Sequence, residues 1–496
     1  MNAAKSLHPH HRTLPAGRPQ TVADPAAPMF SLDQACAWID GAHLLGEGQT
    51  VVRRVHSDTR TLMAGDLFVA LQGERFDANA FLAQARSKGA VAALSNDATA
   101  LAQAGLPGLV VPDTRRALGQ LAAAWRAQFG LPLIAVTGSN GKTTVTQMIA
   151  SILRAWKPQA MLATQGNLNN EIGVPLTLLQ LSARHEVAVL ELGMNHPGEI
   201  QLLAGMASPS VGLVNNAQRE HQEFMSSIEA VARENGAVIE SLGQDGTAVF
   251  PADDEWSALW VSLAGDRPRL RFALSDLDTD ADISARLPSW HAGGWQVRAS
   301  TPAGALDYRL NVAGLHNVKN SLAAAACALA VGAPLPVIAQ GLASFQPVAG
   351  RSRTLALSLA GRDITLVDDS YNANPDSVLA AIDVLAGLPG PRLLVLGDMG
   401  EVGSQGPQFH TEIGAYARQR GIEDFFALGE QTRHSVQAYG GGSHFADIEA
   451  LNQAVRDKLS NLASVLVKGS RFMKMERVVQ SLASQADTRQ GEAHAA

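Results

Sequence analysis

The amino-acid sequence predicts an α/β protein of three domains. Its 496 residues are too many for one hydrophobic core, and 46% apolar against 17% charged residues is an ordinary globular composition. Short apolar runs that end in polar residues alternate with helix-like segments, which is typical of parallel strands joined by helices. A glycine loop follows one of these runs. We therefore expect a central doubly wound sheet with a phosphate loop (P-loop), a mixed α/β N-terminal domain and a Rossmann-like C-terminal domain.

The first segment of the chain shows no sequence pattern typical of helices or strands. Residues 1–28 are rich in Pro, Ala and His and lack an apolar centre, so we expect a disordered tail and not a signal peptide. Residues 29–114 form the predicted first domain, which mixes short strands with helices such as 79–88. Asp113 and Thr114 have the pattern of a cap on a linking helix that runs to Phe129. The expected strands of this domain are 51–55, 66–71, 90–94 and 108–111.

The predicted central domain covers residues 115–348. Its apolar runs 133–137, 186–191 and 211–216 have the character of buried parallel strands, whose carboxyl ends gather ligands. The Ala-rich segment 321–331 is too short to span a bilayer, so we expect a packed helix and no membrane insertion.

The predicted C-terminal domain covers residues 349–496. Its apolar runs again end in Asp, Gly or Lys, with helix-like segments between them, which predicts a second doubly wound sheet. The expected strands are 364–369, 392–398, 424–429 and 464–469.

Charge and cysteine content bear on partners and compartment. The net charge of −7 argues against a nucleic-acid-binding groove. Only Cys36 and Cys327 are present, far apart in the sequence. We expect no disulfide framework and a reducing compartment, the cytoplasm.

The glycine loop after residue 137 is the strongest chemical signal. Backbone N–H groups in such a loop converge on phosphate oxygens, a lysine adds positive charge, and a Ser/Thr hydroxyl can hold Mg2+. Val136 stands where the usual Walker A motif has its first glycine, so the loop fits a shorter Gly-x-x-Gly-Lys-Thr-Thr form. A chance strand–turn–helix junction is the alternative. The loop predicts a nucleoside triphosphate with Mg2+ through Gly138, Ser139, Asn140, Gly141, Lys142, Thr143 and Thr144.

Two further residues follow predicted strands of the same sheet. Glu191 is placed at the mouth of the sheet, where a carboxylate suits Mg2+; a solvated loop acid is the alternative. His221 lies five residues beyond Asn216. It is either structural or a ligand or phosphate contact.

The remaining candidates suit a nucleotide. Asn317 and Asn320 come just before the Ala-rich helix, where their amides suit an adenine edge or a helix cap equally well. Asp369 ends a C-terminal strand and could accept hydrogen bonds from ribose hydroxyls. Arg351 is placed to reach a phosphate across a closing cleft. From the residues alone, the reaction is phosphoryl transfer to an unknown acceptor.

Together these motifs resemble the Mur ligases, the amide-forming ATP enzymes of peptidoglycan synthesis. The resemblance spans nearly the whole chain. The Tyr371–Pro375 and Asn167–Asn170 runs favour the member that joins D-alanyl-D-alanine to UDP-N-acetylmuramoyl-tripeptide over those that add single amino acids. The runs that carry the resemblance are residues 56–60, 65–77, 138–144, 166–175, 191–200 and 368–375.

The resemblance implies roles for individual residues. ATP would bind through the glycine loop, with Lys142, Arg351 and His221 in catalysis. Thr143 and Glu191 would hold one Mg2+ and His221 a second. The other implied contacts are adenine for Asn317 and Asn320, ribose for Asp369, uridine for Ser57, Asp58, Thr59 and Arg60, the muramoyl substrate for Asn167 and Asn169, and D-alanyl-D-alanine for the region of Asn374, Pro375 and Asp376.

The implied reaction passes through an acyl phosphate. Transfer of the γ-phosphoryl group to the peptide carboxylate creates a leaving group, and the dipeptide amine then attacks. The partners would be these small-molecule substrates, and the enzyme would be a monomer. The rival interpretations are another ligase of this superfamily, such as folylpolyglutamate synthase, and a non-catalytic nucleotide-dependent binding protein. The uridine turn at residues 57–60 argues against the first rival, and intact Lys142 argues against the second.

One position departs from the family pattern. Many Mur ligases carry a carbamylated lysine downstream of the histidine, and it holds the second Mg2+. Asn235 stands where we expect that lysine. Since an asparagine cannot be carbamylated, either Glu234, an anion or water completes the second site, or the site is weak. We expect no carbamate.

Overall fold

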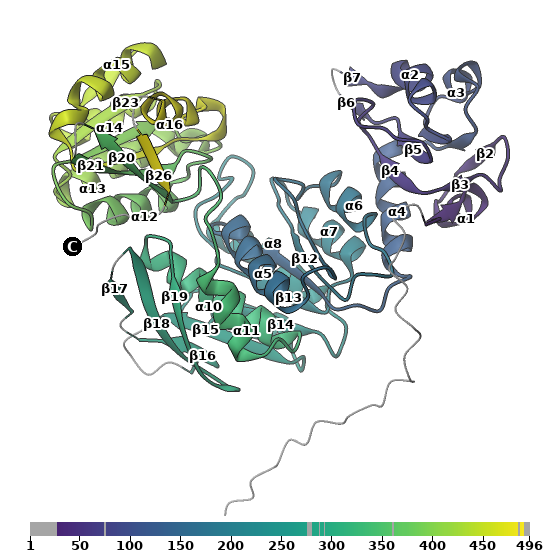
Figure 1. The fold of residues 1–496 in the computed structure, drawn as a ribbon, viewed down its shortest axis with the longest axis horizontal. Coiled ribbons are helices and arrows are strands. Elements are labelled where there is room, and N and C mark those ends of the chain that lie inside the picture. The colour runs from purple at the N-terminus through teal and green to yellow at the C-terminus, as the bar shows by residue number, and fades with distance from the viewer. Residues whose placement is uncertain are drawn as a thin grey trace, which may run out of the picture.

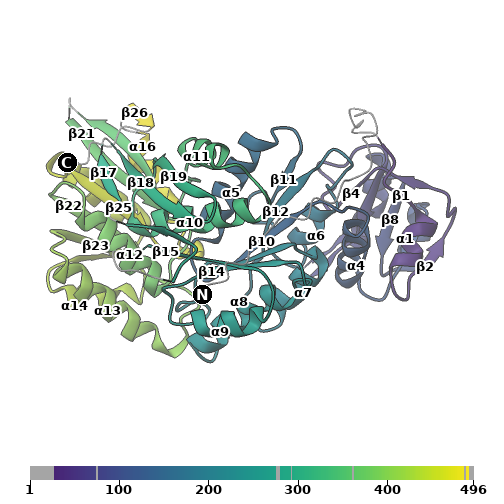
Figure 2. The ribbon, with the colours of Figure 1, turned by 90° about the horizontal axis from the view of Figure 1, so that it is seen from below.

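The computed structural model describes residues 27–73, 76–274, 280–286, 288–291, 293–359, 362–484 and 487–490. The tail predicted for residues 1–28 therefore lies, except for its last two residues, outside the described residues. Figures 1 and 2 show three α/β bodies in a row, with the central body between the N-terminal and C-terminal ones. The predicted fold class is confirmed. No helix in the described part of the chain is long and apolar enough to cross a membrane.

The N-terminal body is built on a five-stranded sheet of order β2-β9-β8-β5-β4. The single strand predicted over 51–55 is wrong, because its two halves pair with different partners: β3 pairs with β1, and β4 pairs with β5. Helices α1 to α3 accompany the strands. The elements are β1 (Phe30–Ser31), α1 (Leu32–Trp38), β2 (His43–Leu45), β3 (Val51–Val52), β4 (Arg54–His56), β5 (Asp66–Val69), β6 (Gln72–Gly73), β7 (Phe76–Asp77), α2 (Leu82–Ser87), β8 (Ala92–Ser95), α3 (Ala98–Ala104) and β9 (Gly108–Val110).

Helix α4 (Thr114–Arg126) joins this body to the central one. The Asp113 carboxylate caps it, as predicted, by accepting from the backbone N–H groups of Arg115 and Arg116. Near its end, Trp125 Nε1 donates to the Leu181 carbonyl at 3.1 Å. The N-terminal body is thus anchored by the helix that leads into the central sheet.

The central sheet holds ten strands among the described residues, in the order β11-β12-β10-β13-β14-β15-β16-β18-β17 with β19 on β18. Strands β10 to β16 run parallel, whereas β17, β18 and β19 form an antiparallel extension that the sequence patterns did not predict. The strands are β10 (Leu133–Thr137), β11 (Met161–Ala163), β12 (Val187–Glu191), β13 (Val211–Val214), β14 (Thr247–Pro251), β15 (Arg269–Leu274), β16 (Ile283–Ala285), β17 (Ser289–His291), β18 (Gly294–Thr301) and β19 (Gly304–Leu310).

Two hydrophobic cores cover the two faces of this sheet. Alternate residues of β10 divide between them: Ile134 and Val136 pack with α5 and α10, whereas Leu133 and Ala135 pack with α7 and α8. This two-sided burial confirms the predicted doubly wound arrangement. The helices are α5 (Lys142–Trp156), α6 (Gly173–Leu178), α7 (Glu199–Ala207), α8 (Ile228–Glu240), α9 (Ser257–Ala264), α10 (Leu315–Ala330) and α11 (Leu335–Ala343).

Helix α10 begins six residues before the predicted start at 321. Asn317 and Asn320 therefore lie inside the helix and not before it. The first turn closes through the Asn317 N–H, which donates to the Gly314 carbonyl at 3.0 Å. The polar first turns carry little apolar periodicity, which hid this start.

The C-terminal body is built on a seven-stranded sheet of order β24-β23-β22-β25-β21-β20-β26, with β20 and β26 antiparallel at one edge. The four predicted strands are confirmed as β21, β22, β23 and β25, and separate cores on the two faces fit the Rossmann-like prediction. The elements are β20 (Arg353–Leu359), β21 (Arg362–Asp369), α12 (Pro375–Ala386), β22 (Arg392–Gly397), α13 (Gly406–Gln419), β23 (Asp424–Leu428), α14 (Thr432–Tyr439), β24 (Ser443–Phe445), α15 (Ile448–Lys458), β25 (Ser464–Lys468), α16 (Glu476–Ala483) and β26 (Asp487–Gln490).

Candidate active site

The candidate site is a cavity of about 930 Å³ between the central and C-terminal bodies. The glycine loop, the ends of β12 and β13 and the start of α10 line it on the central side. The loops after β21, β22 and β25 line it on the other side. Ligand sites of open α/β sheets lie at the carboxyl ends of their strands, and two such edges face each other here.

The glycine loop has the geometry that phosphate binding requires. Strand β10 ends at Thr137, and α5 begins at Lys142. Gly138 and Gly141 have φ angles of +128° and +82°. A Cβ at Gly138 would lie 3.0 Å from the backbone nitrogen of Asn215. Both glycines are therefore required by backbone shape, and the first residues of α5, whose N–H groups have no partner within the helix, line the cavity.

Asparagine side chains form hydrogen bonds that support this loop. Asn215 Nδ2 donates to the Asn140 carbonyl at 2.8 Å and to Asn320 Oδ1 at 2.9 Å. The Asn140 N–H donates to Asn216 Oδ1 at 2.8 Å. Asn317 Oδ1 in turn accepts from Asn320 Nδ2 at 3.1 Å. The structure thus places the predicted adenine residues on the cavity wall, where their amides also brace the loop. Asn215 and Asn216 were not predicted as site residues.

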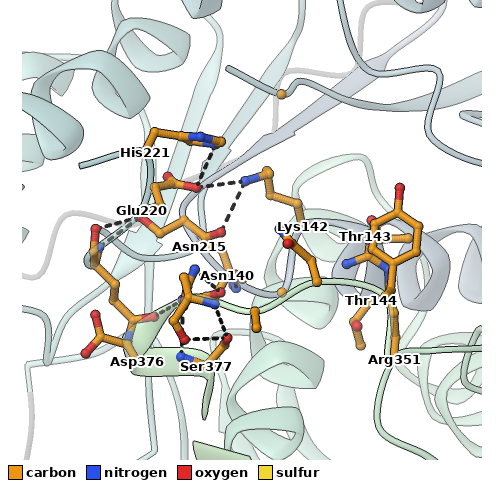
Figure 3. Close-up of a pocket in the computed structure, with 18 of the residues that line it drawn as sticks. Asn140, Lys142, Thr143, Thr144, Asn215, Glu220, His221, Arg351, Asp376 and Ser377 are labelled. Carbon is orange, nitrogen blue, oxygen red and sulfur yellow. Dashed lines mark hydrogen bonds and ion pairs between the residues drawn. The ribbon is translucent and has the colours of Figure 1, made fainter. Parts of the chain in front are cut away.

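Lys142 lies between the loop and a buried acid. Its Nζ donates to the Gly138 carbonyl at 2.5 Å and to the Ser139 carbonyl at 3.2 Å, and it lies 3.3 Å from Glu220 Oε2. Glu220 is only 5% exposed. Figure 3 shows Lys142 and Glu220 directed toward each other above Asn215. The sequence patterns did not predict Glu220 as a site residue. Its position directly before His221 is the feature of the sequence that could have indicated it.

Glu191 ends β12 next to the base of the loop. It pairs with Val136 of β10 in the parallel register and is 2% exposed. Its Oε1 accepts a hydrogen bond from Asn169 Nδ2 at 2.7 Å. Thr143, in the first turn of α5, lines the same cavity. A hydroxyl and a carboxylate oxygen beside a phosphate site are the hard ligands that Mg2+ prefers.

His221 lies at the boundary between the two bodies. Its Nδ1 lies 2.5 Å from Glu401 Oε2 and its Nε2 lies 3.8 Å from Glu220 Oε2. Both His221 and Glu401 have a positive φ, 48° and 57°, which is unusual for residues with a Cβ. The adjacent His221 imidazole holds the pKa of Glu401 below its usual value, although burial opposes this shift.

Asn235 is fully buried next to Glu220. Its Oδ1 accepts from Thr137 Oγ1 at 2.5 Å, and its Nδ2 donates to the Val231 carbonyl at 3.0 Å and lies 3.5 Å from Glu220 Oε1. Glu234, one of the candidates for completing a second metal site, is engaged elsewhere. It accepts from the backbone N–H groups of Gly198 and Ile200 at the start of α7.

The C-terminal wall contributes a carboxylate and cations. Burial alone would raise the pKa of Asp369, but the Lys468 ammonium, 2.6 Å away, lowers it below its usual value. Arg351 stacks on Tyr371, with its guanidinium carbon 4.1 Å from the ring centroid. No acidic side chain in the described part of the chain forms an ion pair with Arg351, so its charge is available to a ligand.

Polar contacts join the two walls. Asn374 Nδ2 donates to Asn140 Oδ1 at 2.9 Å, and Asn374 also caps α12. Arg219, beside Glu220, donates to Asp376 Oδ1 at 2.6 Å and to Glu412 Oε2 at 2.7 Å. Asn374 and Asp376 were predicted near the dipeptide substrate. In this state they hold the bodies together.

Most of the predicted residues line the cavity, but one group does not. Ser57, Asp58, Thr59 and Arg60 form a turn after β4 on the N-terminal body, outside the cavity wall. Hydrogen bonds from Arg60 lower the pKa of Asp58 to about 2. Gly138 is also not part of the cavity lining. The predicted residues that line it are Ser139, Asn140, Gly141, Lys142, Thr143, Thr144, Asn167, Asn169, Glu191, His221, Asn317, Asn320, Arg351, Asp369 and Asn374.

Across the described ranges, no three His, Cys, Asp or Glu side chains come close enough to hold a metal ion by themselves. Mg2+ commonly takes one or two carboxylates and completes its shell with water and substrate phosphates. The cavity can thus position a triphosphate over the loop with a cation, opposite the cationic C-terminal wall.

Comparisons with known proteins cover all three bodies. Family sequence models match residues 51–126 (Mur ligase family, catalytic domain), 136–328 (Mur ligase middle domain) and 350–471 (Mur ligase, glutamate ligase domain). The UDP-N-acetylmuramoyl-tripeptide--D-alanyl-D-alanine ligase of Escherichia coli (strain K12) is 41% identical over 430 residues, which are 86% of this chain and 93% of that protein. The protein of that name from Bacillus subtilis (strain 168) is 33% identical over 448 residues, 88% of this chain and 94% of that protein.

Solved structures agree. A crystal structure of MurF from Acinetobacter baumannii has a TM-score of 0.84 at 34% sequence identity, covering 92% of this chain and 99% of that chain. MurF ligase from Thermotoga maritima in complex with ADP shares the fold, with a TM-score of 0.77 at 24% identity over 87% of this chain and 97% of that chain.

Proposed function

The chain belongs to the Mur ligase family, and from that premise we propose that it joins D-alanyl-D-alanine to UDP-N-acetylmuramoyl-tripeptide with consumption of ATP. The observation that carries the proposal is that the carboxyl ends of the strands of two sheets face each other across the cavity. The glycine loop with Lys142 lies on one side, and Arg351, with no ion-pair partner among the described side chains, lies on the other. A phosphoryl group held between them has cationic groups on both sides.

The reaction is the formation of an amide from a carboxylate, which is a poor electrophile. Transfer of the γ-phosphoryl group of ATP to the tripeptide carboxylate forms an acyl phosphate. The amine of D-alanyl-D-alanine then attacks the acyl carbon, and inorganic phosphate departs. The loop N–H groups and Lys142 hold the phosphates in line, and Arg351 stabilises the charge that develops on the transferred group.

The residues present fit Mg2+. Thr143 supplies a hydroxyl and Glu191 a buried carboxylate that Asn169 orients from 2.7 Å, while His221 lies farther along the same wall. When bound, Mg2+ would neutralise phosphate charge. Glu191 and Thr143 would hold the first ion, and His221 would contribute to a second.

The positions of several residues support the proposed substrate contacts. Asn167 and Asn169 face the cavity beside Glu191, which suits the muramoyl-peptide end. Asn374 and the start of α12 line the C-terminal side of the cavity, which suits the incoming dipeptide. The turn at residues 57–60 would hold the uridine end. Asn317 and Asn320 would lie near adenine and Asp369 near ribose.

We further propose that the enzyme is a monomer of the cytoplasm. Both cysteines, Cys36 and Cys327, are free thiols, which supports a reducing compartment. Size-exclusion chromatography with light scattering tests the oligomeric state: a mass of one chain is expected, and a stable dimer would contradict it.

A direct assay tests the ligase activity. Phosphate release from ATP is measured with UDP-N-acetylmuramoyl-tripeptide, with and without D-alanyl-D-alanine, and the peptide product is followed by mass spectrometry. Release that depends on both substrates and matches product formation is expected. Release that ignores the dipeptide, or a product only with single amino acids, would exclude this ligase activity.

A further inference from the structure

The carboxylate of Glu220 has a position that the proposed function does not yet use. It lies on the cavity wall immediately before His221, and only 5% of the residue is exposed. Burying a carboxylate is costly unless opposite charge and hydrogen-bond donors compensate. The charged and hydrogen-bonding groups around Glu220 therefore indicate which kind of ligand this part of the cavity binds.

One oxygen of Glu220 lies next to the Lys142 ammonium, which is also expected to bind phosphate. Glu220 Oε2 lies 3.3 Å from Lys142 Nζ, in the P-loop that binds phosphate. When a triphosphate occupies the loop, Lys142 turns to the phosphate oxygens. Glu220 then loses its cationic partner, close to the phosphates, while it remains buried. A buried carboxylate in that state needs another cation.

The other oxygen of Glu220 is held by a neutral donor. Asn235 Nδ2 lies 3.5 Å from Glu220 Oε1, and Asn235 is itself fixed by Thr137 Oγ1 and the Val231 carbonyl. A neutral amide orients the carboxylate but leaves its charge uncompensated. Asn235 is thus a positioning residue, and its contact leaves Oε2 facing the cavity.

The neighbouring histidine supplies a second ligand atom. His221 Nε2 lies 3.8 Å from Glu220 Oε2, too far for a hydrogen bond and close enough for both atoms to contact one ion. The other acids near Asn235 and His221 are engaged. Glu234 caps α7, and Glu401 contacts the opposite ring nitrogen of His221.

We propose that Glu220 and His221 together hold the second divalent cation, with Glu220 supplying the negative charge that a carbamylated lysine at position 235 would otherwise supply. This inference rests on the proposed use of ATP with Mg2+. It also explains how an asparagine is tolerated at position 235, because the charge is moved to residue 220 and the asparagine orients it.

Metal binding tests this inference without any ligation step. Mn2+ serves as the probe, and its free concentration is followed by electron paramagnetic resonance in the presence of full-length protein, a non-hydrolysable ATP analogue and UDP-N-acetylmuramoyl-tripeptide. We expect two Mn2+ per chain in the unmodified protein. Glu220→Gln should weaken the second site by at least about tenfold and leave the first unchanged, as loss of a metal-site residue does elsewhere.

A matched control and a charge-preserving variant sharpen the result. Glu234→Gln removes a carboxylate from the same neighbourhood, and it should leave both Mn2+ sites intact. Glu220→Asp keeps the charge and should retain part of the second site. Thermal unfolding and binding of the ATP analogue confirm that each variant is folded.

Several outcomes would overturn the inference. These are equal Mn2+ binding by Glu220→Gln and the unmodified protein, a single Mn2+ per chain in the unmodified protein, or a carbamate mass on a lysine beside His221. A change in nucleotide affinity without any change in Mn2+ binding would mean that Glu220 serves only as the partner of Lys142. If the unmodified protein binds two Mn2+ but forms no product, the proposed ligase activity fails and the metal site stands.

Discussion

Substitution of Arg219 by alanine should loosen the contact between the central and C-terminal bodies. The Arg219 side chain donates from Nε and Nη2 to Asp376 Oδ1 at 3.0 and 2.6 Å. The two side chains are 20% and 22% exposed, so this pair is largely shielded from water. The contact with Glu412 adds less, because that acid is 40% exposed.

The expected magnitude follows from these contacts. Hydrogen bonds to charged groups contribute about 1.5–3 kcal/mol, and exposed ion pairs contribute less than about 1 kcal/mol. The backbone N–H of residue 219 donates to Asp376 Oδ2 at 2.8 Å, and it survives the substitution. We therefore expect a loss of about 2 kcal/mol, which shifts the equilibrium between closed and open forms about 30-fold.

Small-angle scattering and steady-state kinetics measure this effect. Arg219→Ala should increase the radius of gyration and lower kcat/KM for ligation, with little change in the unfolding of the separate bodies. Arg233→Ala is the matched control, because its pair with Glu229 is exposed on both sides, 61% and 52%. Identical scattering and kinetics for the two variants would refute the role of Arg219 in closure.

Four further predictions concern the glycine loop and the proposed Mg2+ sites. Lys142→Ala should lower turnover by at least about 100-fold while the protein stays folded, since the side chain serves charge and not packing; unfolding by circular dichroism, or retained turnover, would contradict this role. Gly138→Ala should abolish binding of an ATP analogue in calorimetry, because its Cβ would lie 3.0 Å from Asn215 and its φ is +128°, and normal affinity would count against the loop geometry. Asn169→Ala should weaken Mn2+ binding at the first site about tenfold by releasing Glu191, and unchanged binding would mean that Asn169 does not orient that carboxylate. Intact-mass measurement should detect no carbamate on any lysine, with a carbamate beside His221 as the opposing result.

Local patterns predicted the parts of the site that follow strands directly. The glycine loop, Glu191 and Asp369 each end or follow an apolar run, and the carboxyl ends of parallel strands meet at one edge. The start of α10 was missed because Asn317 and Asn320 are polar, so its first turns lack the apolar periodicity that predicts a helix. The antiparallel strands β17 to β19 were missed because their pairing is non-local.

The chain pattern alone was sufficient for the fold class, the position of the glycine loop and the family resemblance, because strand periodicity and glycine spacing are encoded within short segments. It also identified Asn235 as a departure. Tertiary packing was needed to show where the compensating charge lies. Glu220 is fifteen residues from Asn235 in sequence, and Glu234 is adjacent to it, yet the helix directs Glu234 toward α7 while the loop after β13 brings Glu220 to 3.5 Å from the Asn235 amide. Side-chain direction on a helix, and not distance along the chain, determines which acid faces the proposed metal site.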